Sequence, residues 1–228
     1  MSILKWDATG ERLYETGVDK GVLYVYDSTK TGAGQHPYSP GVAWNGLTGV
    51  TESPDGAETE DLYADNVKYL SLLSAETLGL TVTAYMYPDE FAICDGSAEL
   101  VTGIMVGQQT RRSFGLSYRT LLGNDTENTD HGYKLHLIYG CVASPSDKDY
   151  ATVNDSPEAI EFSWEVDTTP VDSGKAGVKP TASVVIDSTK VGPAALKAIE
   201  DALYGTENTE AYLPTPSELV ALVNAAQG

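Results

Sequence analysis

The sequence predicts a mainly β (α+β) protein with a C-terminal strand–helix extension. Over residues 78–87, Leu78, Leu80, Val82, Ala84 and Met86 form one apolar face, and Thr81, Thr83, Tyr85 and Tyr87 form the other. Residues 159–166 alternate in the same way between apolar side chains and glutamate or serine. A period of two over these lengths is typical of strands with two different environments. The chain also has 14 Tyr but only 3 Phe, and tyrosine suits half-buried strands because its hydroxyl can reach the edge.

The first third of the chain is predicted to hold an arm, a strand, a loop and a hairpin. Residues 1–20 are polar and are expected to form an arm that packs on its own domain or on a neighbour. Residues 21–26 are rich in β-forming side chains and are expected to be the first core strand. Residues 28–40 are punctuated by Gly and Pro and are predicted to be a loop. Residues 41–69 are predicted to form a β-hairpin that turns at the Ser-Pro-Asp-Gly of residues 53–56, since Pro presets φ and Gly tolerates positive φ.

The middle of the chain is predicted to continue as strands. Pro88 is expected to open a short helix that ends near Cys94, because proline fits a first helical turn and acidic residues follow it. Trp44 and Trp164 lie in alternating patterns among apolar neighbours, so we expect both in the core. The expected strands cover residues 68–73, 78–87, 103–107, 113–121, 133–143 and 159–166.

A Gly-, Lys- and Pro-punctuated stretch at residues 170–180 marks the best candidate boundary. We therefore predict a β core with its N-terminal arm over residues 1–170 and an extension over residues 171–228 that packs on it. The extension is predicted to hold a strand at residues 182–186, a helix at residues 193–204 and a second short helix near residues 216–226. The first helix has apolar residues at helical spacing and a glycine at its C-terminal end.

Charge is the strongest signal in the composition. The chain has 33 acidic against 14 basic residues, a formal net charge of −19. Phosphate neutralisation needs clustered Lys and Arg, so this mode of DNA binding is excluded. Cys94 and Cys141 lack metal-type spacing and are expected to be buried thiols. The first residues show no signal-peptide pattern, and no apolar run approaches the ~20 residues of a membrane helix, so no membrane insertion is expected.

No pattern in the sequence predicts a catalytic residue, a cofactor or a metal site. The three histidines, His36, His131 and His136, are scattered, and a structural or solvent role is favoured for His136. Residues 124–130 alternate oxygen-bearing side chains, which leaves Ca²⁺ as a minor alternative, although the Gly and terminal Glu of an EF-hand pattern are absent. Phosphate-loop, nucleophile-elbow and dinucleotide fingerprints are also absent. We therefore do not expect an enzyme.

An ordered series of short segments resembles the major tail tube protein of siphophages, the long-tailed phages, of the type found in phages of Gram-positive hosts. Each segment is short and structural, but together they cover nearly the whole chain in order. The series comprises residues 14–24, 41–48, 63–69, 84–91, 94–97, 107–109, 114–120, 132–136, 154–159, 162–166, 179–189 and 204–206.

The resemblance implies a tail-tube-type β-sandwich or barrel with one flanking helix, related to the type VI secretion tube protein. It implies hexameric rings that stack into a tube, with inner strands forming a continuous barrel through which viral DNA passes without specific binding. The implied partners are further copies of the chain, the tape measure protein, the tail terminator and the distal tail protein. The implied location is the virion tail, after synthesis in the host cytoplasm. The family has no catalytic residues to transfer.

Candidate site residues follow from this resemblance together with the residue pattern. An acidic channel wall would let phosphates slide, so acidic and polar strand positions are candidates for the lumen. The lumen candidates are Glu58, Glu60, Asp61, Thr81 and Thr83. Long loops can order on a neighbouring subunit, and a basic pair can contact an acidic neighbour, although a solvated turn explains that pair equally well. The inter-subunit candidates are Gln35, His36, Pro37, Tyr38, Arg111 and Arg112.

Two other classes of function are compatible with parts of the sequence. A secreted or surface β-sandwich binding module would also be acidic and rich in tyrosine, but the missing signal peptide counts against it. A hydrolase that uses a carboxylate pair would need two acids at a fixed separation in a concave site. Filaments or rings at high concentration would distinguish a tube protein from a binding module that stays small.

Overall fold

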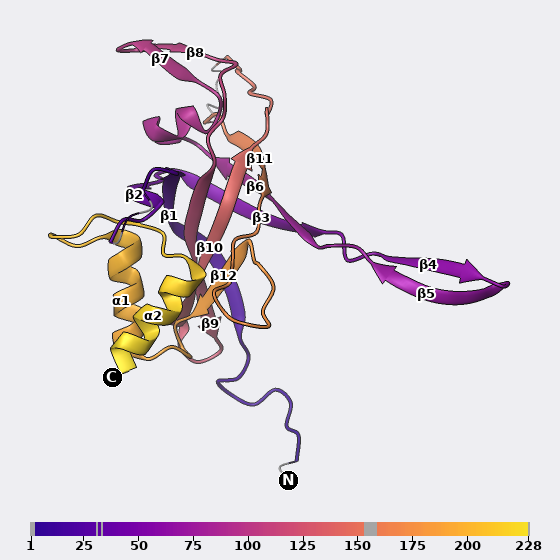
Figure 1. Ribbon diagram of the computed structural model, residues 1–228. Coiled ribbons are helices and arrows are strands. Elements are labelled where there is room, and N and C mark those ends of the chain that lie inside the picture. The colour runs from indigo at the N-terminus through magenta and orange to yellow at the C-terminus, as the bar shows by residue number, and fades with distance from the viewer. Residues whose placement is uncertain (1–2, 31, 33, 153–158, 228) are drawn as a thin grey trace.

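The computed structural model describes residues 3–30, 32, 34–152 and 159–227 and confirms a mainly β protein (Figure 1). A large antiparallel sheet is accompanied by two small hairpins, a short 3-10 helix and two C-terminal helices. The strands of the large sheet are β1 (Tyr14–Tyr26), β2 (Tyr38–Ala43), β3 (Leu47–Asp55), β6 (Thr77–Ala84), β9 (Phe114–Asn124), β10 (Asn128–Ala143), β11 (Phe162–Thr168) and β12 (Ser183–Asp187). The other elements are β4 (Thr59–Ala64), β5 (Val67–Leu73), η1 (Asp89–Ile93), β7 (Ala98–Val101), β8 (Ile104–Val106), α1 (Pro193–Tyr204) and α2 (Pro216–Gln227).

The large sheet has the order β2-β1-β9-β10-β11-β6-β3, and β12 pairs with β10 outside this path. Successive stretches of β10 pair with two different strands. Its residues 134–138 pair with β12, and its residues 141–143 pair with β11. The β11, β6 and β3 strands therefore continue the sheet from one end of β10.

One core lies on one face of β1, β9 and β10 and is lined on its other side by β6 and β11. Trp44 and Trp164 are 4% and 0% exposed and pack edge to face with ring centroids 5.8 Å apart. Phe91 of η1 and Phe114 of β9 join them in the same cluster. The expectation that both tryptophans belong to the core is confirmed.

A second core lies on the opposite face of the same strands, beneath the two C-terminal helices. Leu137 faces this core, whereas its neighbour Ile138 faces the first, as the alternation of a strand requires. Ile199 and Leu203 of α1 contribute the helical side of the core. The helix predicted over residues 193–204 is confirmed, with proline in its first turn and Gly205 at its end at a φ of 75°.

The predicted turn at residues 53–56 is wrong. β3 continues through this stretch, and Pro54 pairs with Leu78 of β6. The turn lies instead between β4 and β5, where Asp65 and Asn66 have φ values of 51° and 63°. Two successive positive φ values are typical of the tight hairpin turn that suits twisted strands, and Asp and Asn tolerate them. Proline is compatible with β3 because β3 is an edge strand.

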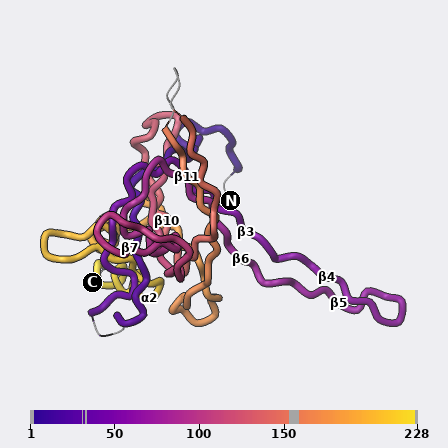
Figure 2. Tube along the Cα trace, turned by 90° about the horizontal axis from the view of Figure 1, so that it is seen from above, coloured from indigo at the N-terminus to yellow at the C-terminus, as the bar shows by residue number. Residues whose placement is uncertain are grey.

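The chain between β3 and β6 forms a long projecting arm. Figures 1 and 2 show β4 and β5 extending away from the body as a two-stranded ribbon. The N-terminal arm is shorter than predicted, because β1 begins at Tyr14 and pairs with the far end of β9. The expected helix after Pro88 is the short η1, and a small hairpin of β7 and β8 follows it.

Candidate assembly surfaces

The layer formed by β3, β6 and β11 has one apolar and one polar face. Val82 and Trp164 are paired across two strands and face the first core. The alternate positions point the other way, so Thr81 lies between Thr51 and Glu165 in one row across the three strands. We call this outward set the polar face. It consists of Thr51, Ser53, Thr81, Thr83, Ser163, Glu165 and Asp167.

The polar face carries two carboxylates and contains no lysine or arginine. Glu165 and Asp167 are exposed, and Thr81 and Thr83 are half-buried between their neighbours. The layer ends at β3, whose second edge has no paired strand in the described part of the chain. An edge strand of nine residues is a ready template for pairing with another chain.

The β4–β5 arm is itself two-faced. Leu62 lies directly opposite Leu70, and Leu72 follows on the same face, with exposures of 40%, 37% and 52%. On the other face Asp61 accepts a hydrogen bond from Ser71 and pairs with Lys68 at 2.7 Å. These contacts hold the pKa of Asp61 below its ordinary value. An isolated two-stranded ribbon is marginally stable in water, so burial of the leucine face would stabilise the arm.

The lumen candidates predicted from the sequence separate into two groups. Thr81 and Thr83 lie on the polar face. Glu60 and Asp61 lie on β4, and Glu58 just precedes it. All three therefore belong to the projecting arm. The register of β3 with β6 decides this separation, because β3 continues to Asp55 through the stretch where a turn was predicted.

A polar cluster on the β1, β9 and β10 sheet contacts the root of the arm, and sequence reasoning did not find it. Tyr118 donates a hydrogen bond to Glu52 of β3 at 2.5 Å. Nδ1 and Nε2 of His136 lie 3.6 Å from Glu52 and 3.4 Å from Glu15. Lys134 donates to the same Glu15 carboxylate at 2.5 Å. The cluster joins four strands, and only the fold brings these distant residues together.

Two carboxylates of this cluster are stabilised in their charged form. Contact with His136 lowers the pKa of Glu52, and the hydrogen bond from Tyr118 adds to this effect against partial burial. Burial opposes ionisation of Glu15, but its hydrogen bonds with Lys134 and Thr120 hold its pKa below the ordinary value. Burial and the Glu52 carboxylate together raise the pKa of Tyr118. The structural role favoured for His136 is therefore to hold the carboxylates of Glu15 and Glu52 in place.

The inter-subunit candidates in the loop before β2 are partly engaged within the chain. His36 stacks on Tyr212 with ring centroids 3.5 Å apart, and its Nδ1 lies 2.9 Å from Glu218. Tyr38 is 4% exposed and belongs to the second core, so it does not lie at the surface. Gln35 is exposed, and Pro37 is half-buried.

The two arginines of the basic pair have different environments. Arg111 donates a hydrogen bond to the Ala143 carbonyl at 3.0 Å and lies 3.5 Å from Asp95. Arg112 is exposed. Arg112 is therefore the more exposed of the two.

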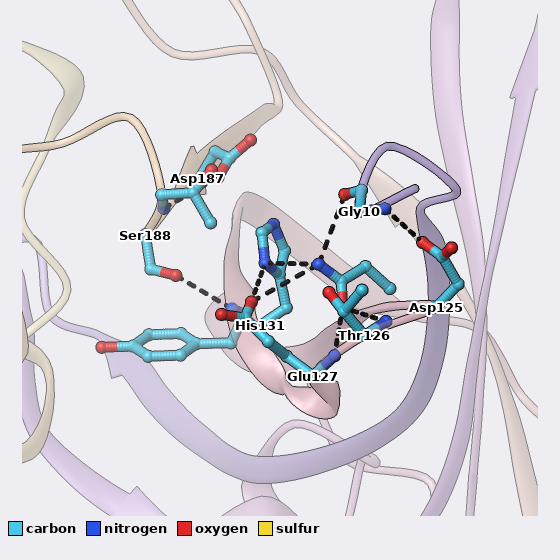
Figure 3. A network of polar contacts seen from close by, with 10 residues as sticks. Gly10, Asp125, Thr126, Glu127, His131, Asp187 and Ser188 are labelled. Atoms are coloured by element: carbon cyan, nitrogen blue, oxygen red, sulfur yellow. Dashed lines mark hydrogen bonds and ion pairs between the residues drawn. The ribbon is translucent and has the colours of Figure 1, made fainter. Parts of the chain in front are cut away.

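The turn between β9 and β10 holds the N-terminal segment (Figure 3). Gly10 donates its backbone N–H to Asp125 at 2.9 Å, and the Asn124 amide donates to the Gly10 carbonyl at 3.3 Å. The Asn124 carbonyl oxygen accepts the Glu127 N–H at 2.6 Å, and His131 lies 2.6 Å from the Glu127 carboxylate. Side-chain oxygens of Asn124, Asp125 and Glu127, which were considered as Ca²⁺ ligands, thus take part in the hydrogen bonds of this turn. Within the described ranges, no group of three His, Cys, Asp or Glu is placed to hold a metal ion.

These features define a mainly β chain with a large antiparallel sheet, a polar face that ends in an open edge, and the projecting β4–β5 arm. No helix in the described part of the chain has the length and apolar character that a membrane crossing requires.

Comparison with known proteins adds a coarse likeness. No protein-family model and no curated protein matches the chain. Two cryo-EM structures of an extracellular contractile injection system (PVC) align with it. The sheath/tube terminator in the extended state aligns with a TM-score of 0.31 and 9% identity over 81% of this chain and 99% of that chain. The sheath-tube complex in the extended state aligns with a TM-score of 0.30 and 10% identity over 74% and 88%. Similarity at this level carries no functional argument.

Proposed function

We propose that this chain is a non-enzymatic structural protein that polymerises as stacked hexameric rings into a phage tail tube, the conduit for genome delivery. The polar face of the β3-β6-β11 layer is the observation that carries this proposal. A tube wall needs one face packed on a core and one polar face that can line a water-filled channel, and the core-facing and outward sides of this layer support such a role.

The chemistry of the polar face suits a DNA conduit. Glu165 and Asp167 repel phosphates, and the hydroxyls of Thr81 and Thr83 keep the wall hydrated without a cation that would hold the DNA. We assign Thr81 and Thr83, with these two acids, to the lumen. The arm carries Glu58, Glu60 and Asp61, so we assign these three residues to the contact between subunits.

The open edge of β3 and the leucine face of the arm supply the means of assembly. Closing neighbouring sheets into one barrel removes the exposed edges of every subunit. An arm laid on a neighbour would bury the faces of Leu62, Leu70 and Leu72, which are solvent-exposed in the single chain. Exposed Arg112 and Gln35 remain candidates for further contacts. The tape measure, terminator and distal tail proteins are the partners that this function implies.

Two adjacent leucines give a matched test of this proposal. Leu72 lies on the leucine face of β5, and Leu73 lies on the opposite face, with exposures of 52% and 68%. We expect Leu72→Asp to abolish rings and tubes in negative-stain electron microscopy, and Leu73→Asp to leave them intact. Equal loss in both variants would reject the assigned arm face. A wild-type chain that stays monomeric at high concentration would reject the function and favour the β-sandwich binding module.

A further inference from the structure

An open groove lies between η1 and the β7–β8 hairpin. Its volume is about 640 Å³, and Met86, Ile93 and Met105 give it apolar walls with exposures of 59%, 36% and 51%. Asp89 and Glu90 of η1 lie along the same groove, as does Glu99 of β7. No lysine or arginine is among the residues that line it. The groove therefore suits an extended segment with large apolar side chains and a positive charge.

The N-terminal segment has this chemistry. Ile3, Leu4 and Trp6 are 89%, 73% and 78% exposed, so three large apolar side chains stand in solvent. Lys5 lies between them, and residues 3–6 contain no acid. The bonds between Gly10 and the β9–β10 turn fix the base of this segment, so its apolar part projects beyond the body (Figures 1 and 3).

The segment and the groove lie at opposite ends of β9. Gly10 contacts Asn124, the last residue of β9, whereas Phe91 of η1 packs on Phe114, the first residue of β9. At ~3.4 Å per residue, β9 alone spans roughly 34 Å. The chain from Gly10 to Ile3 reaches at most roughly 25 Å when fully extended. The segment cannot reach the groove of its own chain, so it can occupy this groove only in another copy.

We propose that residues 3–6 of one copy bind the groove between η1 and the β7–β8 hairpin of a second copy, in a head-to-tail contact. The inference rests on the proposed function, because it names the contact that would stack one ring on the next. The β4–β5 arm is a poorer occupant, because it brings Glu60 and Asp61 toward an acidic groove with only Lys68 to offset them. Such a heterologous contact repeats along an axis, as a stacked tube requires.

Cysteine crosslinking between two different single variants tests this contact. Leu4→Cys places a thiol on the segment, and Met105→Cys places one on the groove. The two native thiols are buried, and burial raises the pKa of Cys94 to about 12, so background reaction is low. Under mild oxidation we expect a covalent dimer when the two variants are mixed, and none when either variant is oxidised alone. Absence of the mixed dimer would overturn the proposal.

This test separates the inference from the function on which it rests. A mixed dimer in a protein that forms no rings by electron microscopy would keep the head-to-tail contact and reject the ring assembly. Rings without a mixed dimer would keep the assembly and reject the contact. Absence of both would reject both.

A charge variant on the hairpin provides a matched control. Met105→Asp alters the groove, whereas Leu100→Asp adds the same charge to the same hairpin at a 66% exposed residue that does not line the groove. We expect Met105→Asp to leave single rings that no longer stack and Leu100→Asp to stack normally. Mixing Met105→Asp rings with Trp6→Asp rings should restore stacking, but only to pairs, because each ring keeps one working surface. Normal tubes from Met105→Asp alone would overturn the proposal.

Discussion

The imidazole of His136 lies flat on the ring of Tyr118, with centroids 4.6 Å apart and planes 5° apart. The same tyrosine donates its hydroxyl hydrogen bond to Glu52 on β3, at the root of the projecting arm. The stack thus fixes the position of β3 relative to β9 and β10. β3 held in this way presents the polar face in one orientation.

The Glu52 contacts make the free energy of unfolding depend on pH. The folded-state pKa of Glu52 is lowered, so its stabilisation is present above the unfolded value of about 4.3 and is lost as pH falls through the folded pKa. We expect Glu52→Gln to cost about 1 kcal/mol at pH 7, because it weakens one hydrogen bond to a charged group and removes the attraction of His136 at a carboxylate that solvent partly screens. The difference from wild type should shrink below that unfolded value. Denaturant melts across this range measure it. Glu165→Gln is the control and should change little, and an equal pH effect there would contradict the assignment.

Trp164 offers a test of core packing. It is fully buried, and its indole N–H has no hydrogen-bond partner among the described residues. We expect Trp164→Ala to lower the free energy of unfolding by about 3–5 kcal/mol, because it leaves a large cavity. Trp164→Phe should cost much less, since it keeps an aromatic ring and removes an unpaired polar group. Chemical melts give both values. A loss below about 1 kcal/mol for the alanine variant would contradict burial.

The turn of the arm should be sensitive to β-branched residues. Asn66 has a φ of 63°, which valine strongly disfavours. We expect Asn66→Val to speed hydrogen exchange of the β4 and β5 amides and to leave the thermal midpoint unchanged, because the arm projects from the body. Asn66→Gly should preserve the wild-type exchange pattern. Unaltered exchange in the valine variant would argue against this turn.

Reversing charge on the polar face should make the tube hold DNA. We expect the double variant Glu165→Lys and Asp167→Lys to assemble but to retain DNA or slow its passage, with the effect relieved by added salt. Retention can be measured by DNA co-sedimentation with tubes at low and high salt. Glu207→Lys changes an exposed acid on a distant loop and should retain no DNA. Salt-independent retention, or none at all, would contradict an electrostatic role of this face.

Strong local patterns predicted much of the fold. The alternation around Leu80 and Trp164 identified β6 and β11, and the apolar spacing before Gly205 identified α1. Each of these elements buries one well-defined face, so its apolar residues recur with the period of a strand or a helix. The beginning of β1 was missed because its first residues are exposed and polar, and pairing with β9 makes them a strand.

The positions of residues on the candidate assembly surfaces were harder to predict from the sequence. The Pro54 signal for a turn was misread because proline is compatible with an edge strand. That error placed Glu58 and Glu60 on a hairpin strand beside β3, whereas they belong to the projecting β4–β5 arm. The cluster around His136 joins Glu15 and Glu52 from two other strands, and no local spacing reveals such a contact. Strand alternation alone placed Thr81 and Thr83 on the outward face, and the structure has them there, whereas their place in a lumen stays a prediction.

Cryo-electron microscopy of the purified chain at high concentration tests the central claim most directly. We expect a hollow tube of stacked rings in which Thr81, Glu165 and Asp167 face the channel and β3 joins a neighbouring sheet. A tube with this polar face turned outward, or a chain that remains monomeric, would contradict it.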